Sequence, residues 1–247
     1  MLEKMQGIVM KTQDYGETHK IVTIFSDRNG KISAIARGAK KPKSRMAAVT
    51  QPFIHGDFHI YLNSGLSTIQ QGDVINSLRR IREDIIKTAY GSYIVELTDK
   101  LTDSHLPNHY LFDQLYQTLN WIAEYEDADI PIMMYELKLF NTGGFAPIVD
   151  KCVNCGNGSG PFAFSIGEGG LLCTACQHLD HNAVPLPNNL ARLLHIFSEV
   201  ALERIGNISV KPENKKLLRS IMDAYYDQYG GYYLKSKRFL QQLDKLK

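Results

Sequence analysis

The chain has 247 residues, 44% of them hydrophobic, and a formal net charge of only +2. That length favours more than one domain, and that composition can fill a sizeable core. No run of about 18 apolar residues occurs, which excludes a membrane-spanning helix. Met1–Lys4 leads into strand-like sequence without the apolar core of a signal peptide, so a cytoplasmic location is expected.

The charge is unevenly distributed along the chain. Residues 1–80 carry 12 basic and 6 acidic side chains, whereas residues 81–247 carry 16 basic and 20 acidic ones. The basic excess therefore lies in the first third. A polyanionic partner is expected to bind there.

Residues 6–76 have the pattern of short β-strands. Apolar residues recur in short runs separated by glycine-containing turns, and Asn29-Gly30 is a strong two-residue hairpin signal. About five strands without an intervening helix predict a small closed barrel. An oligonucleotide-binding (OB) fold is the expected barrel, although strand count alone also fits an SH3-like barrel.

A loop over residues 36–45, called the basic loop below, lies between two of these strands. Gly38 and Pro42 keep it from forming a regular helix or a central strand. Its positive residues, with no acidic residue among them, are Arg37, Lys40, Lys41, Lys43 and Arg45. Such a cluster, fixed at both ends by strands, suits a phosphate backbone. A merely solvated loop is the alternative. Lys20 and Lys31 extend the predicted patch.

The strand after the basic loop has two distinct faces. Ile54, Phe58, Ile60 and Leu62 share one face, which is predicted to be core. The other face carries Phe53, His55, His59 and Tyr61, on which bases are predicted to stack beside the loop expected to hold phosphates. The alternative is that Phe53 and Tyr61 are partly buried and the histidines are solvated.

From Arg80 onward the apolar period changes to three and four. The first predicted helix runs to about Asp103 and contains Gly91, whose cost inside a helix implies close packing there. The other predicted helices lie over residues 111–122, from Pro131 to Gly143, after Pro187 and after Pro212. The apolar faces of these helices predict a helical core and give no indication of a catalytic or cofactor site.

All four cysteines fall into two C-x2-C pairs. Cys152/Cys155 and Cys173/Cys176 are separated by 17 residues, within the range of four-thiolate zinc sites. Four thiolates predict one closed, structural Zn²⁺ ion. Two disulfides are disfavoured in a reducing cytoplasm, and a redox dithiol would need only one pair. His178 and His181 are near enough in sequence to replace one cysteine.

The segment 234–240 combines positive and apolar side chains. Lys235, Lys237 and Arg238 lie beside Phe239 and two leucines. This combination can bind an acidic peptide tail that ends in hydrophobic residues. The alternative is a basic helix C-terminus that complements the helix dipole.

Recognisable catalytic motifs are absent from the sequence. It contains no H-E-x-x-H, deaminase H-x-E, G-x-S-x-G or G-x-x-x-x-G-K-[ST] pattern, and its eight histidines are scattered. The chain is therefore predicted not to be an enzyme. Two alternatives stay open: a nuclease with dispersed carboxylates, and an RNA-binding or ribosome-associated barrel with a zinc module.

Several short motifs, in this order and spacing, are similar to those of one known family. They are Asp14-Tyr15-Gly16-Glu17 with Lys20, Ala36 to Lys41, Gln71 to Val74, Glu136 to Leu139, Gly144 to Pro147, the four cysteines, and Tyr233 to Ser236. Over essentially its full length the chain resembles the RecO recombination mediators of bacteria, most of all those of Gram-positive bacilli. Many members lack some of the cysteines, so the zinc prediction rests on the spacing in this chain.

The resemblance implies a fold and a function. The implied fold is a multi-domain α+β protein with an OB-fold domain, a helical domain and an inserted zinc module. The implied function is to bind single- and double-stranded DNA, anneal complementary strands and help load the RecA recombinase onto DNA coated by single-strand-binding protein. RecR and the acidic tail of single-strand-binding protein are the implied partners.

The expected domain boundaries follow from these patterns. Residues 1–79 form the nucleic-acid-binding barrel, 80–149 and 179–247 the helical domain, and 150–178 the zinc module. The expected DNA-binding residues are Arg37, Lys40, Lys41, Lys43, Arg45, Lys20, Lys31 and Tyr61. The expected peptide-binding residues are Lys235, Lys237, Arg238 and Phe239.

Overall fold

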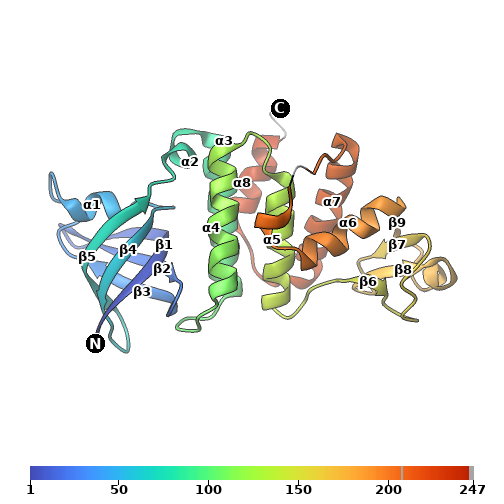
Figure 1. Ribbon diagram of the computed structural model, residues 1–247, viewed down its shortest axis with the longest axis horizontal. Coiled ribbons are helices and arrows are strands. Elements are labelled where there is room, and N and C mark those ends of the chain that lie inside the picture. Colours follow the sequence, from blue (N-terminus) through green and yellow to red (C-terminus); the bar gives the residue numbers. More distant parts are fainter. Residues whose placement is uncertain (207, 245–247) are drawn as a thin grey trace. The chain divides into compact units, whose positions relative to one another are not determined.

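The computed structural model describes residues 1–206 and 208–244. It contains two compact units (Figure 1). The first comprises residues 1–126 together with the segment from Leu234 onward, and the second comprises residues 127–233. The division predicted from the sequence, with boundaries at residues 79, 149 and 178, stays a prediction.

The first unit begins with a closed five-stranded barrel. Its strands are β1 (Leu2–Tyr15), β2 (His19–Ser26), β3 (Gly30–Ala36), β4 (His55–Tyr61) and β5 (Ser67–Asn76). The strand order is β1-β2-β3-β5-β4, with β1 pairing both β2 and β4 and with β3 parallel to β5. This closed, partly Greek-key order confirms the OB-like fold.

The barrel core follows the predicted strand alternation. Ile54, Phe58 and Ile60 are buried, as expected, against residues of β1 to β3. The short helix α1 (Arg45–Val49) adds Val49 to this core. The hairpin between β2 and β3 differs from the two-residue turn predicted, because Gly30 (φ +62°) already pairs with Ser26 and leaves a three-residue loop.

Phe53 and His55 are not on an open stacking surface, and that prediction was wrong. Phe53 lies in a turn with φ +69° and is 4% exposed. The His55 ring lies 4.4 Å from the Tyr116 ring and near Phe112 of α4, and burial lowers its pKa. The His55 ring is covered by α4 and the Phe53 ring lies against Gly91 of α3, and strand alternation alone carries no information about that cover.

Four helices complete the first unit: α2 (Arg79–Glu83), α3 (Ile85–Leu101), α4 (His109–Glu124) and α8 (Lys235–Asp244). The single helix predicted from Arg80 is interrupted at Asp84, whose side chain accepts hydrogen bonds from the Ile86 and Lys87 amides and so caps α3. The close packing expected around Gly91 is confirmed. A Cβ at Gly91 would lie 3.0 Å from Ile81 and 3.2 Å from the Phe53 ring.

The second unit combines three helices with a small sheet. The helices are α5 (Asp129–Thr142), α6 (Asn188–Glu199) and α7 (Pro212–Tyr229). The sheet has the order β6-β8-β7-β9, from β6 (Ile148–Cys152), β7 (Phe162–Ser165), β8 (Gly170–Cys173) and β9 (Val184–Leu186). Short 3₁₀ turns lie at η1 (Thr174–Leu179) and η2 (Leu202–Arg204). None of the helices in the described ranges is long and apolar enough to cross a membrane.

Helix α5 is the centre of the second unit, and two of its buried polar side chains join it to its neighbours. The Glu136 carboxylate is fully buried and lies 2.8 Å from Nη2 of Arg219 on α7. The Lys138 ammonium donates to the Phe197 carbonyl at 2.9 Å, near the end of α6. Burial lowers the pKa of Lys138 to about 8. These contacts fix the helices that flank the sheet.

Candidate nucleic-acid interface and metal centre

The basic loop is held against one end of the barrel. The Gly38 amide donates to Nδ1 of His19, and the Lys40 amide donates to the Thr18 carbonyl, each at 3.0 Å. Ala39 is buried with the barrel core. Gly38 has φ +69°, which glycine adopts without strain. The loop backbone is therefore fixed while its long side chains point away from the core.

Four of the five positive side chains in the basic loop are exposed and unpaired. Within residues 1–206 and 208–244, no carboxylate pairs with Arg37, Lys41, Lys43 or Arg45. Lys40 differs, because its Nζ lies 2.8 Å from the Asp14 carboxylate of β1, and this hydrogen bond lowers the pKa of Asp14. The loop lacks an acid in its own sequence, but the fold supplies one from a neighbouring strand.

The two predicted extensions of the patch lie in different places. Lys20 pairs in register with Asp14 and Ala36, beside the start of the basic loop. Lys31 lies at the other end of β3. Its Nζ is 3.1 Å from the Asp99 carboxylate, and its side chain is only 15% exposed. Lys31 therefore does not join the patch, since it holds the barrel against α3.

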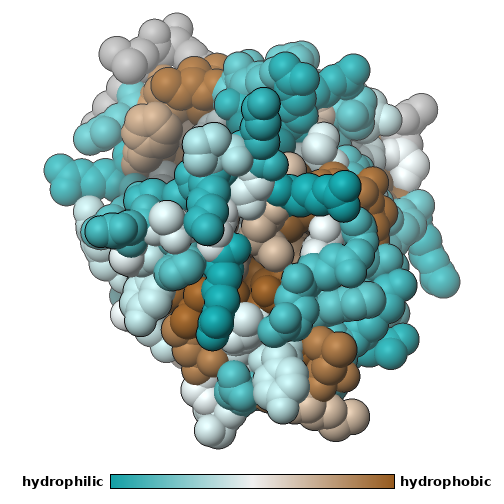
Figure 2. Space-filling view, turned by 90° about the vertical axis from the view of Figure 1, so that its left-hand side faces the viewer, coloured by the Kyte–Doolittle hydropathy of each residue, from teal (hydrophilic) through white to brown (hydrophobic). Residues whose placement is uncertain are grey.

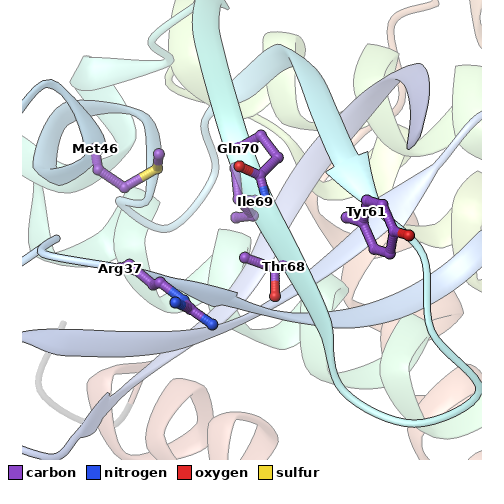
Figure 3. Close-up of a pocket in the computed structure, with 6 residues that line it drawn as sticks. All are labelled: Arg37, Met46, Tyr61, Thr68, Ile69 and Gln70. Carbon is purple, nitrogen blue, oxygen red and sulfur yellow. The ribbon is translucent and has the colours of Figure 1, made fainter. Parts of the chain in front are cut away.

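A surface hollow of about 380 Å³ lies next to the basic loop (Figure 3). Its lining residues are Arg37, Met46, Tyr61, Thr68, Ile69 and Gln70. Tyr61 is 49% exposed, so the predicted aromatic side chain and the predicted basic loop meet at one site. Sequence reasoning missed Thr68 and Gln70. Only the parallel pairing of β3 with β5 brings them beside Arg37.

The hydropathy of the barrel side is mixed. Figure 2 shows hydrophilic residues over most of this face, with hydrophobic surface visible between them. Proteins bind single strands through a positive groove beside aromatic side chains, and on this face exposed Arg37 and Tyr61 line one hollow.

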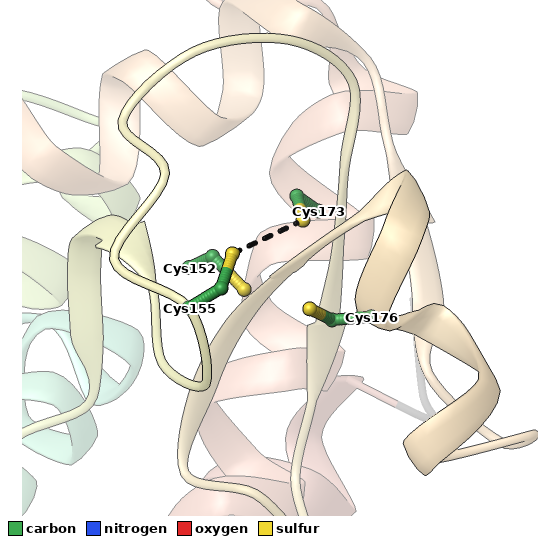
Figure 4. A group of neighbouring side chains, drawn as sticks. All are labelled: Cys152, Cys155, Cys173 and Cys176. Atoms are coloured by element: carbon green, nitrogen blue, oxygen red, sulfur yellow. Dashed lines mark hydrogen bonds between the residues drawn. The ribbon is translucent and has the colours of Figure 1, made fainter.

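The four cysteines converge on one point (Figure 4). Cys152 and Cys173 end β6 and β8, Cys155 lies in the turn after β6, and Cys176 lies in η1. Their sulfur atoms all lie within 4.8 Å of one another, and Cys155 and Cys173 are 3.6 Å apart. A tetrahedral ion with Zn–S bonds of 2.3 Å needs sulfur separations of about 3.8 Å. The donor set therefore fits such an ion with little movement.

The local backbone favours one thiolate at this centre, that of Cys152. Burial opposes ionisation of Cys152, but the amides of Cys155, Cys173 and Asn154 lower its pKa to about 6. The Asn154 amide, 3.3 Å from the Cys176 sulfur, favours that thiolate, yet burial and the other thiols raise the Cys176 pKa to about 11. Ionising a second cysteine beside the first thiolate costs free energy unless a bound cation compensates the added negative charge.

The cluster contains the cysteines alone. In the part of the chain that the structure describes, neither His178 nor His181 joins the group of candidate metal ligands. Nδ1 of His178 lies 2.9 Å from the Ala175 carbonyl. Gly156 (φ +75°) closes the turn after the first pair, and its amide donates to the Cys152 carbonyl at 2.9 Å. The four cysteines can hold one metal ion.

The positive segment at the C-terminal end forms the start of α8, which packs against α3. The Glu96 carboxylate accepts hydrogen bonds from the Lys235 and Ser236 amides, at 3.3 and 2.9 Å, and so caps this helix. Lys235, Arg238 and Phe239 are exposed, whereas Lys237 is only 8% exposed. Lys237 therefore has little surface to offer a peptide, because it lies on the packed side of α8.

Two family models match the chain. One is described as Recombination protein O N terminal and matches residues 1–78, and the other as Recombination protein O C terminal and matches residues 82–238. A protein named DNA repair protein RecO from Oceanobacillus iheyensis is 59% identical over 244 residues, 99% of this chain and 95% of that protein. Those from Bacillus cereus and Bacillus anthracis are each 49% identical over 245 residues, 99% of both chains.

Proposed function

The chain belongs to the RecO family of DNA repair proteins, and we propose that it is a recombination mediator that works by binding DNA strands and not by catalysis. In this proposal it anneals complementary single strands and, with RecR, helps load RecA onto DNA coated by single-strand-binding protein, in the cytoplasm at the nucleoid. The observation that carries the proposal is the fixed basic loop on an OB-like barrel.

The charges of the basic loop supply the mechanism. Arg37, Lys41, Lys43 and Arg45 bind phosphates and release the counterions condensed on DNA, which favours binding to any sequence. Two complementary strands repel each other through their phosphates. Once part of that charge is neutralised at the barrel surface, the strands approach closely enough to pair. Lys40 contributes less, because Asp14 already compensates its charge.

We expect the loop variant, Lys41→Ala/Lys43→Ala/Arg45→Ala, to anneal complementary oligonucleotides roughly tenfold more slowly than the wild type, since it loses three phosphate-binding groups. The measurement is the rate of quenching of a fluorophore when its strand pairs with a quencher strand. The matched control is Lys151→Ala/Lys211→Ala/Lys216→Ala, which removes the same charge from the second unit. Equal rates for both variants would contradict a role for the basic loop.

The acidic tail of single-strand-binding protein is the second partner that we propose. Lys235 and Arg238 supply charge and Phe239, 40% exposed, supplies apolar surface for a tail that ends in hydrophobic residues. In the same assay Lys235→Glu/Arg238→Glu should slow the annealing of strands coated with that protein and leave the annealing of naked strands unchanged. A loss on both substrates would contradict the assignment.

The metal proposed for the four cysteines is Zn²⁺ in a structural role. Four thiolates leave no open position for a water, so the ion closes the site and supplies no Lewis-acid chemistry. The two loops that carry the cysteine pairs are thereby fixed to the sheet of β6 to β9. Zinc then acts on DNA binding only indirectly, through the stability of the second unit.

A further inference from the structure

The barrel presents three neighbouring strands around the surface hollow. In the order β3-β5-β4, Ala36 pairs with Ile69 and Tyr61 pairs with Thr68. Arg37 and Tyr61 therefore lie on opposite sides of β5 (Figure 3). Strand β3 pairs with β5 only over residues 34–36 and 67–69. Strand β3 ends at Ala36, opposite Ile69, and the hollow lies beside this end.

The lining of the hollow has the chemistry of a nucleotide site. Tyr61 offers an exposed ring, Arg37 an unpaired guanidinium, and Met46 a polarizable thioether. Thr68 and Gln70 offer groups that donate and accept hydrogen bonds, and buried Ile69 closes the inner side. The volume of about 380 Å³ lies at the low end of the range for small-molecule sites, which suits one nucleotide.

We propose that this hollow binds one unpaired nucleotide of a DNA single strand, with the base stacked on Tyr61 and a neighbouring phosphate on Arg37. The proposal rests on the proposed function and adds a site that distinguishes single strands from duplex. In a duplex both faces of each base are covered by its neighbours, and exposing one costs a few kcal/mol. A single strand offers its bases without that cost.

The same lining makes the site tolerant of base identity. Every base has a face that can stack on Tyr61. The Gln70 amide and the Thr68 hydroxyl adapt to donors or acceptors on a base edge. Arg37 belongs both to the hollow and to the basic loop, so the phosphates of one strand can continue from the hollow onto Lys41 and Lys43. A strand held this way keeps its other bases free to pair.

The test compares Tyr61→Ala with wild type by fluorescence anisotropy on four probes: oligothymidylate, the same backbone without bases, a blunt duplex of equal length, and oligouridylate. Loss of the stacked base should weaken oligothymidylate binding about 5- to 150-fold. Binding of the abasic strand and of the duplex should not change.

Tyr61→Phe should retain affinity for oligothymidylate, and Tyr61→Thr, which keeps a β-favouring residue, should reproduce the loss. Tyr125→Ala removes a similarly exposed ring (55% exposed) outside the barrel and is the matched control.

The outcomes distinguish failure of the nucleotide site from failure of the proposed function. Unchanged oligothymidylate binding by Tyr61→Ala, or an equal loss on the abasic strand or duplex, would overturn the nucleotide site. If the loop variant still lost affinity, the proposed function would stand without that site. No binding of any probe by the wild type would instead refute the proposed function. Tighter binding of oligouridylate than of oligothymidylate would overturn DNA as the ligand.

Discussion

Chelating the Zn²⁺ that we propose at the four-cysteine cluster is expected to destabilise the sheet of β6 to β9 and to lower the melting temperature of the protein. The strands of this sheet have only three to five residues, and the loop after Cys155 is exposed and rich in glycine. Strands β7 and β8 are buried, with the Phe164 ring 5.8 Å from the Tyr225 ring, so the ion acts mainly on the exposed loop and on the ends of the strands that carry the cysteines. Structural Zn²⁺ supplies about 10–16 kcal/mol of apparent binding free energy in small modules, and this contribution is lost with the ion.

The variant Cys173→Ser should have the same effect, because a hydroxyl replaces one of four thiolates. Elemental analysis should find one zinc per wild-type chain and a strongly reduced content in the variant. Thr174→Ala changes the exposed neighbour of the same ligand and should keep the metal. Hydrogen exchange at β7 and β8 locates the unfolding. A metal-free protein with unchanged melting and unchanged exchange would contradict a structural ion.

Replacing Arg219 with Met is expected to destabilise the second unit by about 3–5 kcal/mol, because the buried Glu136 carboxylate loses its ion pair with Arg219. The Glu136 carboxylate is fully buried, and Arg219 lies 2.8 Å from it and 3.2 Å from Asp223. Met keeps most of the apolar contact of the Arg side chain but supplies no positive charge. Hydrogen exchange of the α5 amides measures the free energy of opening of this unit.

The double variant Glu136→Gln/Arg219→Met separates loss of charge pairing from loss of packing. Gln keeps the shape of Glu without its charge, so most of the lost free energy should return. Barrel amides should exchange at wild-type rates in both variants. A cost below about 1 kcal/mol for Arg219→Met, the value typical of exposed pairs, would show that the ion pair is solvated.

Sequence patterns predicted the fold well where neighbouring residues decide it. The spacing of the cysteine pairs placed all four sulfurs around one point, since each C-x2-C turn aims two side chains the same way. Alternation along residues 54–60 identified Ile54, Phe58 and Ile60 as core. Both inferences need only the local period of the chain. The side-chain set that can bind a metal was therefore available from the sequence.

The failures concern contacts between residues far apart in sequence. His55 was expected at the surface but is covered by Tyr116, some 60 residues later. Lys31 was expected to bind phosphate but pairs with Asp99. Helix α8 buries Lys237 against its unit while leaving Lys235 exposed. Period and composition identify the type of face a residue occupies, but only the packing of distant elements determines which faces meet solvent.

The most direct test of DNA binding by the barrel is a salt series of oligonucleotide binding, measured by fluorescence anisotropy. Each lost single-strand phosphate contact lowers the slope of log affinity against log salt by about 0.7, so the loop variant should flatten it by about 2. Lys40→Ala alone should change the slope least, because Asp14 already pairs with Lys40. If the loop variant has the same slope as the wild type, the basic loop does not bind phosphates. The DNA-binding surface would then have to lie on another part of the protein.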